Sequence, residues 1–389
     1  MFHLRTIAKN SYICIMNIVI ILLCVVYLAR VFIIGVAATK TRKKYNVNIN
    51  NSYKPFVSVI VPAKDEEKNI ENCINSILNV NYPPELYEII IVNDRSEDNT
   101  LNVINKMASK HNNIKICNIT QNNSNPNLKG KAGAIKTGID NAKGEYLLMT
   151  DADCIVHPNW INTITKHFID GKENKENVGM VCSYTNVKCN NIFHYFQAAE
   201  WAYMHTYACA GIGLNTVMGC FGNNIAITKE SYNKIGGYET LKFSVTEDFV
   251  LLKAIFDAGF SIRYLCMEDS VVETLPENSF KDYMVQRKRW SVGGISLGFK
   301  AFIYVASSVA LWLAIIFSIF AGSLELLIAS CLVRFLGDCL ILFPVFNTLN
   351  IRYLKKWIPL SVCFYSVIEL LLPFIIINKK VHWKGQTFN

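Results

Sequence analysis

The segment Gln286-Arg287-Lys288-Arg289-Trp290 carries an amide, three cations and an indole ring in five residues. If it is helical, Gln286, Arg289 and Trp290 face the same way, because residues three and four apart share one side of a helix. That face suits a phosphate-bearing ligand beside a stackable, hydroxyl-rich one. Arg287 and Lys288 fit equally well on a basic helix that rests on anionic lipid, so these residues alone leave both interpretations open.

Two aspartates, Asp151 and Asp153, flank Ala152 shortly after the apolar run Tyr146–Met149, with Thr150 between them and the run. Because side chains alternate along an extended chain, both carboxylates point to one side. Two hard oxygen ligands at the end of a strand suit Mg²⁺ or Mn²⁺, which keeps water ligands and takes substrate phosphates. A D-x-D pattern alone often marks only a turn, but its position after a strand predicts a metal site.

Two further acidic positions have alternative interpretations. Asp94 ends a second apolar run, where a carboxylate either accepts hydrogen bonds from a base or ribose or caps the following helix. Thr246-Glu247-Asp248 opens a predicted helix, and acids in a first turn also favour the helix dipole. The position of this T-E-D pattern between the D-x-D and the Gln286–Trp290 segment favours a general base at Asp248.

The elements that must position these residues alternate along the chain. Strands are predicted at 57–61, 88–92, 114–119, 146–149 and 261–265, and helices at 67–79, 97–109, 130–142 and 248–258. This alternation predicts an α/β fold with a parallel sheet covered by helices on both faces, and ligands of such sheets bind at the carboxyl ends of the strands. The residues predicted there are Pro62-Ala63-Lys64-Asp65-Glu66, Asn93-Asp94-Arg95-Ser96 and Thr150-Asp151-Ala152-Asp153.

The glycine patterns of two common nucleotide sites do not occur where this fold would need them. Pro62 and acidic residues follow the first strand in place of G-x-G-x-x-G, which argues against a dinucleotide site. Gly130-Lys131 is followed by Ala132 and lacks the upstream glycine of a P-loop. Lys129 and Lys131 precede a helix, where they either meet phosphate or remain solvated.

The composition indicates a membrane protein with a large soluble part. Of 389 residues, 51% are hydrophobic and 18% charged, and the mean hydropathy is +0.23. Part of the net charge of +9 clusters beside the apolar runs, which predicts a cytoplasmic α/β domain under the positive-inside rule. We expect no nucleic-acid partner, since no basic-aromatic stripe occurs. The 13 cysteines have no C-x-x-C pair and are expected to be free thiols.

The expected organisation is an anchor at 1–39, a basic linker at 40–55, an α/β domain at 56–295, a membrane region of two to three helices at 296–380 and a tail at 381–389. Candidate spans lie at 301–321, 324–346 and 357–378. Arg334 and Asp338, inside the second, are expected to form a structural ion pair rather than a transport path. If all three segments crossed the membrane, Lys379, Lys380 and Lys384 would lie outside the cell. One of the three segments is therefore a candidate for a helix in the membrane interface.

Taken together, the chain resembles membrane-embedded family 2 glycosyltransferases with a GT-A domain. This group includes cellulose, chitin, hyaluronan and poly-N-acetylglucosamine synthases and ceramide glucosyltransferase. The resemblance covers about residues 55–295 and the flanking membrane helices. The matching motifs are Val57–Ala63, Asn93–Thr100, Lys129–Ala134, Asp151–Asp153, Gly222–Asn224, Thr246–Asp248 and the Q-x-x-R-W of Gln286, Arg289 and Trp290.

The resemblance implies inverting transfer of a sugar from a nucleotide diphosphate, expected to be UDP, to a glycan or lipid. It implies catalytic roles for Asp248 as general base and for Arg289 and Gln286, with Mg²⁺ or Mn²⁺ on Asp151 and Asp153. The implied donor-binding residues are Pro62, Ala63, Asp65, Glu66, Asp94, Lys131 and Asp151, and the implied acceptor-binding residues are Trp290, Glu247 and Asn223.

Several alternatives remain open from the sequence. The acceptor is either a polymer that grows by repeated addition or a lipid that receives one sugar. A nucleotidyltransferase of similar fold and a non-catalytic subunit of a polysaccharide secretion complex are the remoter possibilities, and secretion-complex partners are conceivable for the enzyme as well.

Overall fold

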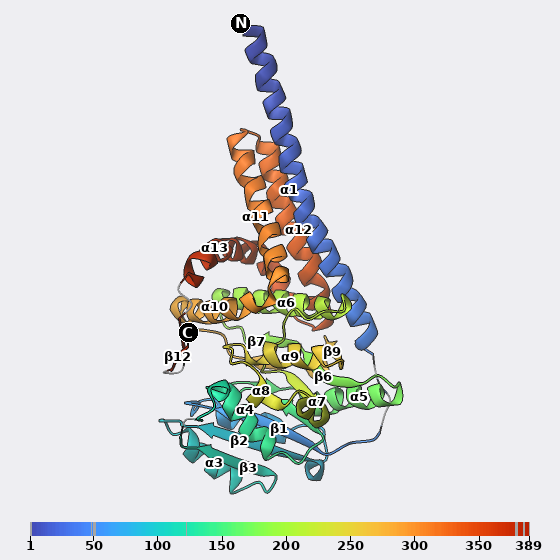
Figure 1. Cartoon of the computed structure of the whole chain (residues 1–389), viewed down its shortest axis with the longest axis vertical. Coiled ribbons are helices and arrows are strands. Elements are labelled where there is room, and N and C mark those ends of the chain that lie inside the picture. The colour runs from blue at the N-terminus through green and yellow to red at the C-terminus, as the bar shows by residue number, and fades with distance from the viewer. Residues whose placement is uncertain are drawn as a thin grey trace.

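The computed structural model describes residues 2–47, 49, 52–121, 123–377, 380–383 and 386–388. Figure 1 shows three long helices, α1 (Phe2–Tyr45), α11 (Phe299–Phe320) and α12 (Leu324–Thr348), running side by side along the long axis. An α/β unit lies at one end of this bundle. Helices α6 (Ile192–Gly213) and α10 (Phe280–Gly294) lie between the two parts (Figure 1).

The α/β unit is built on a seven-stranded sheet in the order β3-β2-β1-β4-β8-β6-β9. Its strands are β1 (Val57–Ala63), β2 (Tyr87–Asp94), β3 (Ile114–Ile119), β4 (Tyr146–Met149), β6 (Val178–Ser183), β8 (Ile225–Thr228) and β9 (Ser261–Leu265). Strand β8 runs antiparallel to both of its neighbours, and the other pairings are parallel. The carboxyl ends of β1, β2 and β4 therefore share one edge, as the sequence predicted.

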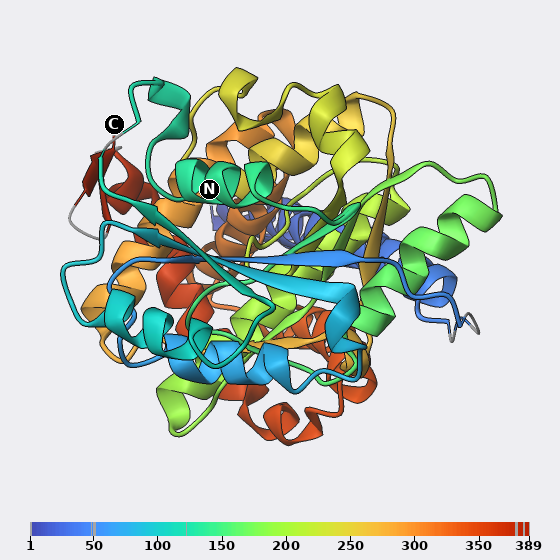
Figure 2. The same ribbon diagram turned by 90° about the horizontal axis from the view of Figure 1, so that it is seen from below.

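Both faces of the sheet are buried, which explains why its strands are apolar runs rather than alternating ones. Val59 and Val61 pack with α2 (Ile70–Leu78) on one face, whereas Ile60 packs with α4 (Lys131–Asp140) on the other. Figure 2 shows helices covering the two sides of the sheet. The predicted α/β fold is confirmed.

The remaining elements frame the site. The other helices are α3 (Thr100–Ala108), α5 (Trp160–Glu173), α7 (Lys229–Lys234), α8 (Gly237–Thr240), α9 (Glu247–Asp257) and α13 (Ile358–Ile376). A small sheet contains β5 (Ile155–Val156), β10 (Val272–Thr274) and β7 (Thr185–Val187), and β11 (Val381–Trp383) pairs with β12 (Gln386–Phe388). Helix α3 begins three residues later than expected, because Asp98 Oδ1 accepts the Thr100 amide at 3.0 Å.

Helix α1 continues through the basic segment that the sequence analysis assigned to a linker. Thr41 and Arg42 are buried, and the Tyr45 ring lies 5.4 Å from the guanidinium carbon of Arg263 in β9. The helix continues beyond Thr39 because its last turns pack against the α/β unit. The anchor and the domain are thus joined by a packed helix up to Tyr45, and the non-helical connection begins only at Asn46.

Within the described residues, four helical segments are long and apolar enough to cross a membrane: Ile13–Tyr45, Phe299–Phe320, Leu324–Thr348 and Arg352–Ile376. The last of these contains α13, which runs across the bundle axis rather than along it (Figure 1). Strand β11, which follows α13, contacts α10. The chain therefore turns back to α10 after α13. Lys379 and Lys384 lie outside the described residues.

The expected ion pair inside α12 is present, and it has a third member. Arg334 Nε lies 3.2 Å from Asp338 Oδ2, and Arg334 Nη1 lies 2.9 Å from Glu369 Oε2 on α13. Tyr27 of α1 donates a hydrogen bond to Asp338 at 3.3 Å. Polar groups at this depth are paired across three helices, because an isolated charge in an apolar environment is costly.

Candidate active site

A cavity of about 1150 Å³ opens where the carboxyl ends of β1, β2 and β4 meet α9, α10 and the start of α11. The predicted site residues on its wall are Pro62, Ala63, Glu66, Asp94, Lys131, Asp151, Asp153, Asn223, Glu247, Asp248, Gln286, Arg289 and Trp290. Asp65 does not line it. Its backbone adopts a left-handed conformation with φ of +53°, and its carboxylate accepts the Glu97 amide at 2.8 Å.

Lys131, in the first turn of α4, joins two of the acidic motifs. Its Nζ lies 2.5 Å from Asp151 Oδ1 and 3.7 Å from Glu247 Oε1, and its side chain is 14% exposed. Burial lowers the pKa of Lys131, but the charges of Asp151 and Glu247 outweigh it, so the net pKa shift is upward. Lys131 is therefore a fixed cation inside the cavity rather than a solvated lysine.

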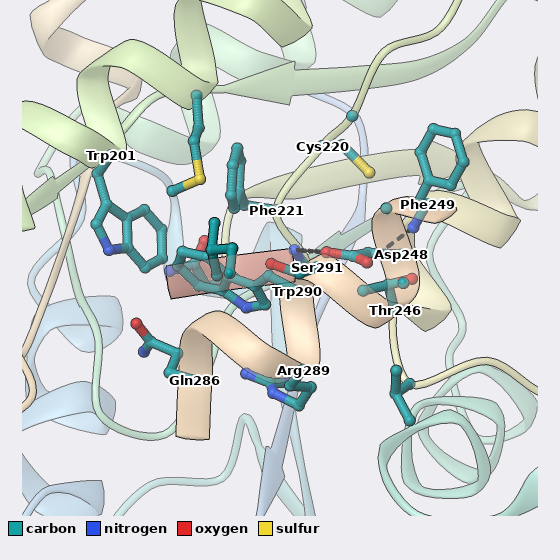
Figure 3. Close-up of a pocket in the computed structure, with 18 of the residues that line it drawn as sticks. Trp201, Cys220, Phe221, Thr246, Asp248, Phe249, Gln286, Arg289, Trp290 and Ser291 are labelled. Atoms are coloured by element: carbon teal, nitrogen blue, oxygen red, sulfur yellow. Dashed lines mark hydrogen bonds between the residues drawn. The ribbon is translucent and has the colours of Figure 1, made fainter. Parts of the chain in front are cut away.

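Asp248, in the first turn of α9, is held by two backbone amides. Its Oδ2 accepts the Gly222 N–H at 2.7 Å and its Oδ1 accepts the Phe249 N–H at 2.8 Å, as the dashed lines in Figure 3 show. Burial and then the neighbouring charge of Glu247 raise the pKa of Asp248 to about 6, against the opposing charge of Lys131. A carboxylate with this pKa is ionised at neutral pH and basic enough to accept a proton.

Close packing fixes α10 against the T-E-D loop. A Cβ atom on Gly293 would collide with the Thr246 side chain, whereas one on the adjacent Gly294 would meet open space.

Residues Gly294–Gly298 match the G-x-S-x-G pattern of serine hydrolases. That nucleophile needs a strand-to-helix turn, and this segment instead joins α10 to α11.

On α10, the structure separates the residues of the Gln286–Trp290 segment by face. Gln286, Arg289 and Trp290 line the cavity, and Gln286 Nε2 donates to Glu277 Oε1 at 2.9 Å. Arg287 is buried, 3.0 Å from Glu200 Oε1 on α6, and its guanidinium carbon lies 3.8 Å from the centroid of the Trp290 ring. Arg287 therefore braces α10 and does not rest on lipid, which corrects the alternative raised from the sequence.

Three aromatic rings form one wall beside Asp248. The Trp201 ring lies 5.0 Å from Trp290 and 5.2 Å from Phe221, and Phe221 lies 5.8 Å from Trp290, measured between centroids. Figure 3 shows them gathered above α10. Sequence reasoning missed Trp201 and Phe221. Trp201 belongs to an apolar helix without a motif, although Phe221 directly precedes the Gly222–Asn224 loop.

Two of the predicted binding residues already have partners. Arg95 Nε and Nη2 each lie 2.7 Å from Asp94 Oδ1, so Asp94 is held in place at the rim of the sheet. Asn223 is buried, and its Oδ1 accepts the Thr185 hydroxyl at 3.0 Å. Asn223 lines the cavity but its amide oxygen is engaged, which indicates that it supports the loop that carries Gly222.

The cavity does not end at the aromatic wall. It continues between α11 and α13, where its lining is mostly apolar and includes Val305, Val309, Trp312, Ile316, Leu370 and Phe374. Several of these side chains are exposed. The same cavity thus reaches from the acidic strand ends to the apolar side chains of two membrane-type helices.

A model of glycosyl transferase family 21 matches residues 16–389. The chain belongs to glycosyl transferase family 21. The sequence resemblance to membrane-bound glycosyltransferases is thereby confirmed, the matched family being number 21.

Two curated relatives share about a quarter of their aligned residues with this family 21 chain. It is 27% identical over 249 residues to the probable glycosyltransferase YdaM of Bacillus subtilis, covering 61% of this chain and 55% of that protein. It is 26% identical over 269 residues to a beta-monoglucosyldiacylglycerol synthase of Nostoc, covering 67% of this chain and 53% of the relative. The chain thus spans about half the length of these relatives.

Among solved structures, a mannosyltransferase from Pyrobaculum calidifontis in complex with GDP-mannose and Mn²⁺ superposes with a TM-score of 0.60 at 19% identity. The match covers 90% of this chain and 99% of that one. At this identity the likeness establishes the shared GT-A fold. The family 21 chain therefore has the fold that its motifs implied.

The two D-x-D carboxylates fit a divalent ion that takes its other ligands from water and substrate. Asp151 and Asp153 line the same cavity, and no group of three metal-binding side chains occurs in the part of the chain that the structure describes. Two carboxylates suit Mg²⁺ or Mn²⁺ that completes its coordination with water and substrate phosphates. They do not form a closed site that would hold an ion without substrate.

Proposed function

We propose that this family 21 protein is a membrane-bound, inverting glycosyltransferase that moves a sugar from a UDP-sugar to a lipid acceptor. One observation carries the proposal: a single cavity joins the acidic strand ends and Asp248 to an apolar groove between α11 and α13. A polar donor and an apolar acceptor can therefore meet inside it. The names of the relatives support a glycosyltransferase, and one of them is a glycolipid synthase.

The donor end of the cavity matches a nucleotide diphosphate. Asp94 would hold the nucleoside, while Lys131 and Arg289 would face the pyrophosphate, whose negative charge grows as the glycosidic bond breaks. Each opposite charge pair at about 4 Å contributes roughly 4 kcal/mol at an effective dielectric near 20. A divalent ion held by Asp151 and Asp153 would supply Lewis-acid stabilisation of the same leaving group, as the Mn²⁺ bound with GDP-mannose in the Pyrobaculum enzyme suggests.

At the acceptor end of the cavity, Asp248 would act as the general base. Asp248 would take the proton of the acceptor hydroxyl as that oxygen attacks the anomeric carbon from the face opposite the leaving group, which inverts the configuration in one displacement. The Gly222 and Phe249 amides aim the carboxylate. Trp201, Phe221 and Trp290 would exclude water and pack against the sugar or the lipid.

We further propose that the α/β domain is cytoplasmic and that α13 lies in the membrane interface. The basic turn of α1, Arg42–Lys44, adjoins the α/β unit, as the positive-inside rule requires of a cytoplasmic flank. If α1, α11 and α12 span and α13 does not, the C-terminal segment returns to the cytoplasmic side. This arrangement removes the conflict that three C-terminal spans would create.

The test is transfer by purified protein in vesicles supplied with labelled UDP-glucose, UDP-N-acetylglucosamine or UDP-galactose. A single labelled glycolipid and released UDP are expected. Release of pyrophosphate would identify a nucleotidyltransferase instead, and a ladder of products would identify a polymer synthase. Asp248→Asn protein is the control for background hydrolysis of the donor.

A further inference from the structure

Two charged side chains of α11 and α13 line the cavity: Lys300, at the start of α11, which donates to the Thr216 hydroxyl and the Val217 carbonyl, and Glu369 on α13. Its carboxylate is held on one side by Arg334, with Nη1–Oε2 at 2.9 Å and Nη2–Oε1 at 3.3 Å, and by the Tyr304 hydroxyl at 3.3 Å. The side chain nevertheless keeps 17% of its surface exposed. A paired carboxylate therefore faces the part of the cavity that the mostly apolar residues of α11 and α13 line.

The apolar part of the groove fits an acyl chain. Val305, Val309 and Ile316 lie on one face of α11, at spacings of four and seven residues. Val305, Val309, Leu370 and Phe374 line the groove and are exposed. Exposed apolar side chains on membrane-type helices suit an acyl chain that enters from the surrounding bilayer.

Glu369 lies on α13, on the bundle side of α6 and α10, whereas Asp248 lies on α9, on the side of the α/β unit (Figure 1). Trp201 packs on Trp290 near Asp248, whereas Tyr207, six residues later on α6, packs on Tyr304, which bonds Glu369. The group that meets Glu369 is therefore a different part of the acceptor from the hydroxyl that Asp248 would deprotonate.

A carboxylate accepts hydrogen bonds and repels phosphate. We propose that Glu369 is a specificity-determining residue that binds a second hydrogen-bond donor, a hydroxyl or an amide N–H, on the lipid acceptor. This inference rests on the proposed lipid glycosyltransferase function. Arg334 and Tyr304 position the carboxylate, and the groove walls hold the acyl chain.

Asp338 supplies a matched control. Asp338 and Glu369 both pair with Arg334, but Asp338 is 1% exposed and does not line the cavity. Asp338→Asn and Glu369→Gln each remove one negative charge from the same cluster. If the cluster has a purely structural role, both variants should change acceptor KM and kcat in the same way. If Glu369 recognises the acceptor, only Glu369→Gln should weaken acceptor affinity.

The experiment measures KM and kcat for acceptors in phosphatidylcholine vesicles. The probes are 1-monoacylglycerol and its 2-O-methyl ether, and a long-chain N-acyl amino-diol and its analogue methylated at the secondary hydroxyl and the amide nitrogen. We expect the wild type to prefer the unmethylated member of at least one pair about tenfold in KM. Glu369→Gln should abolish that preference mainly through KM, while Asp338→Asn should retain it.

Glu369→Asp keeps the charge beside Arg334 but withdraws the carboxylate by one methylene, and it should weaken the preference even if Glu369→Gln fails to fold. No preference in either pair, or equal changes in Glu369→Gln and Asp338→Asn, would overturn the inference. A wild-type protein that releases UDP but glycosylates no lipid in the vesicles would instead refute the proposed function.

Discussion

Lys131 Nζ lies 2.5 Å from Asp151 Oδ1, so the first turn of α4 places a cation directly on the D-x-D motif. The same ammonium group lies 3.7 Å from Glu247 Oε1, beside Asp248. One side chain thus connects the residues proposed to hold the donor with the residue proposed to activate the acceptor. Its removal should disturb both ends of the reaction.

Lys131→Met should therefore shift the pH dependence of transfer. The charge of Lys131 lowers the pKa of Asp248, so without it that pKa rises further above its ordinary value. The acidic limb of kcat/KM should move to higher pH by about one unit, as loss of one neighbouring opposite charge commonly causes. Lys129→Met, which changes an exposed lysine two residues away, should leave the limb in place. An unmoved limb in Lys131→Met would contradict the coupling.

Asp248→Asn should retain binding of the UDP-sugar and lose transfer by about 10²- to 10⁴-fold. In the wild type, kcat/KM should rise with pH around a midpoint near 6, the pKa of Asp248. Calorimetric binding of the donor and initial rates in vesicles separate the two effects. Asp257→Asn, at the exposed end of the same helix, is the control, and near-normal turnover of Asp248→Asn would remove this residue from the base role.

The same raised pKa predicts how stability depends on pH. An acid with a folded-state pKa above its unfolded value stabilises the fold while it is protonated, below about pH 4, and this contribution is lost as pH rises through about 6. The melting temperature of the wild type should therefore fall between about pH 4 and pH 6, and Asp248→Asn should lack this part of the pH dependence. An equal pH dependence of the melting temperature in the two proteins would contradict the raised pKa.

Gly293→Ala should impair catalysis much more than Gly294→Ala. The added methyl group at Gly293 collides with Thr246 and would displace the T-E-D loop, and misplacement by about 1 Å can cost about 10²-fold in rate. At Gly294 the methyl group meets open space, and alanine should stabilise the helix by about 0.5–1 kcal/mol. Initial rates and melting temperatures of the two variants provide the comparison, and equal rates would show that this contact is unimportant.

Removal of divalent ions should abolish transfer. Excess EDTA should stop the reaction, and added Mg²⁺ or Mn²⁺ should restore it, because the two carboxylates Asp151 and Asp153 need an ion to bind diphosphate. Asp153→Asn should raise the ion concentration for half-maximal rate about tenfold, since one ligand charge is lost. Full activity in EDTA would exclude the metal role.

The strand ends could be predicted because parallel strands bring their carboxyl ends to one edge whatever the intervening loops do. That rule located Asp94, Asp151 and Pro62 without any knowledge of side-chain contacts. The spacing of Gln286, Arg289 and Trp290 likewise defined one face of a helix.

Other parts of the site depend on packing between segments far apart in the sequence. Trp201 and Glu369 come from apolar helices whose composition indicates only burial, and their role as cavity walls arises from how α6 and α13 cross the bundle. Asp65 satisfied the strand-end rule, yet its left-handed turn points the carboxylate toward Glu97. The burial of Arg287 depended on Glu200, which no local pattern identified.

One hydrophobic core contains Ile60 of the sheet and Tyr27 and Val31 of α1 without a break. The two halves of the molecule therefore share interior residues instead of meeting across a hinge. Heating should therefore unfold the α/β unit and the helical bundle in a single cooperative transition. A fragment that begins after Tyr45 should lose solubility, because removal of α1 exposes the core residues that α1 covers.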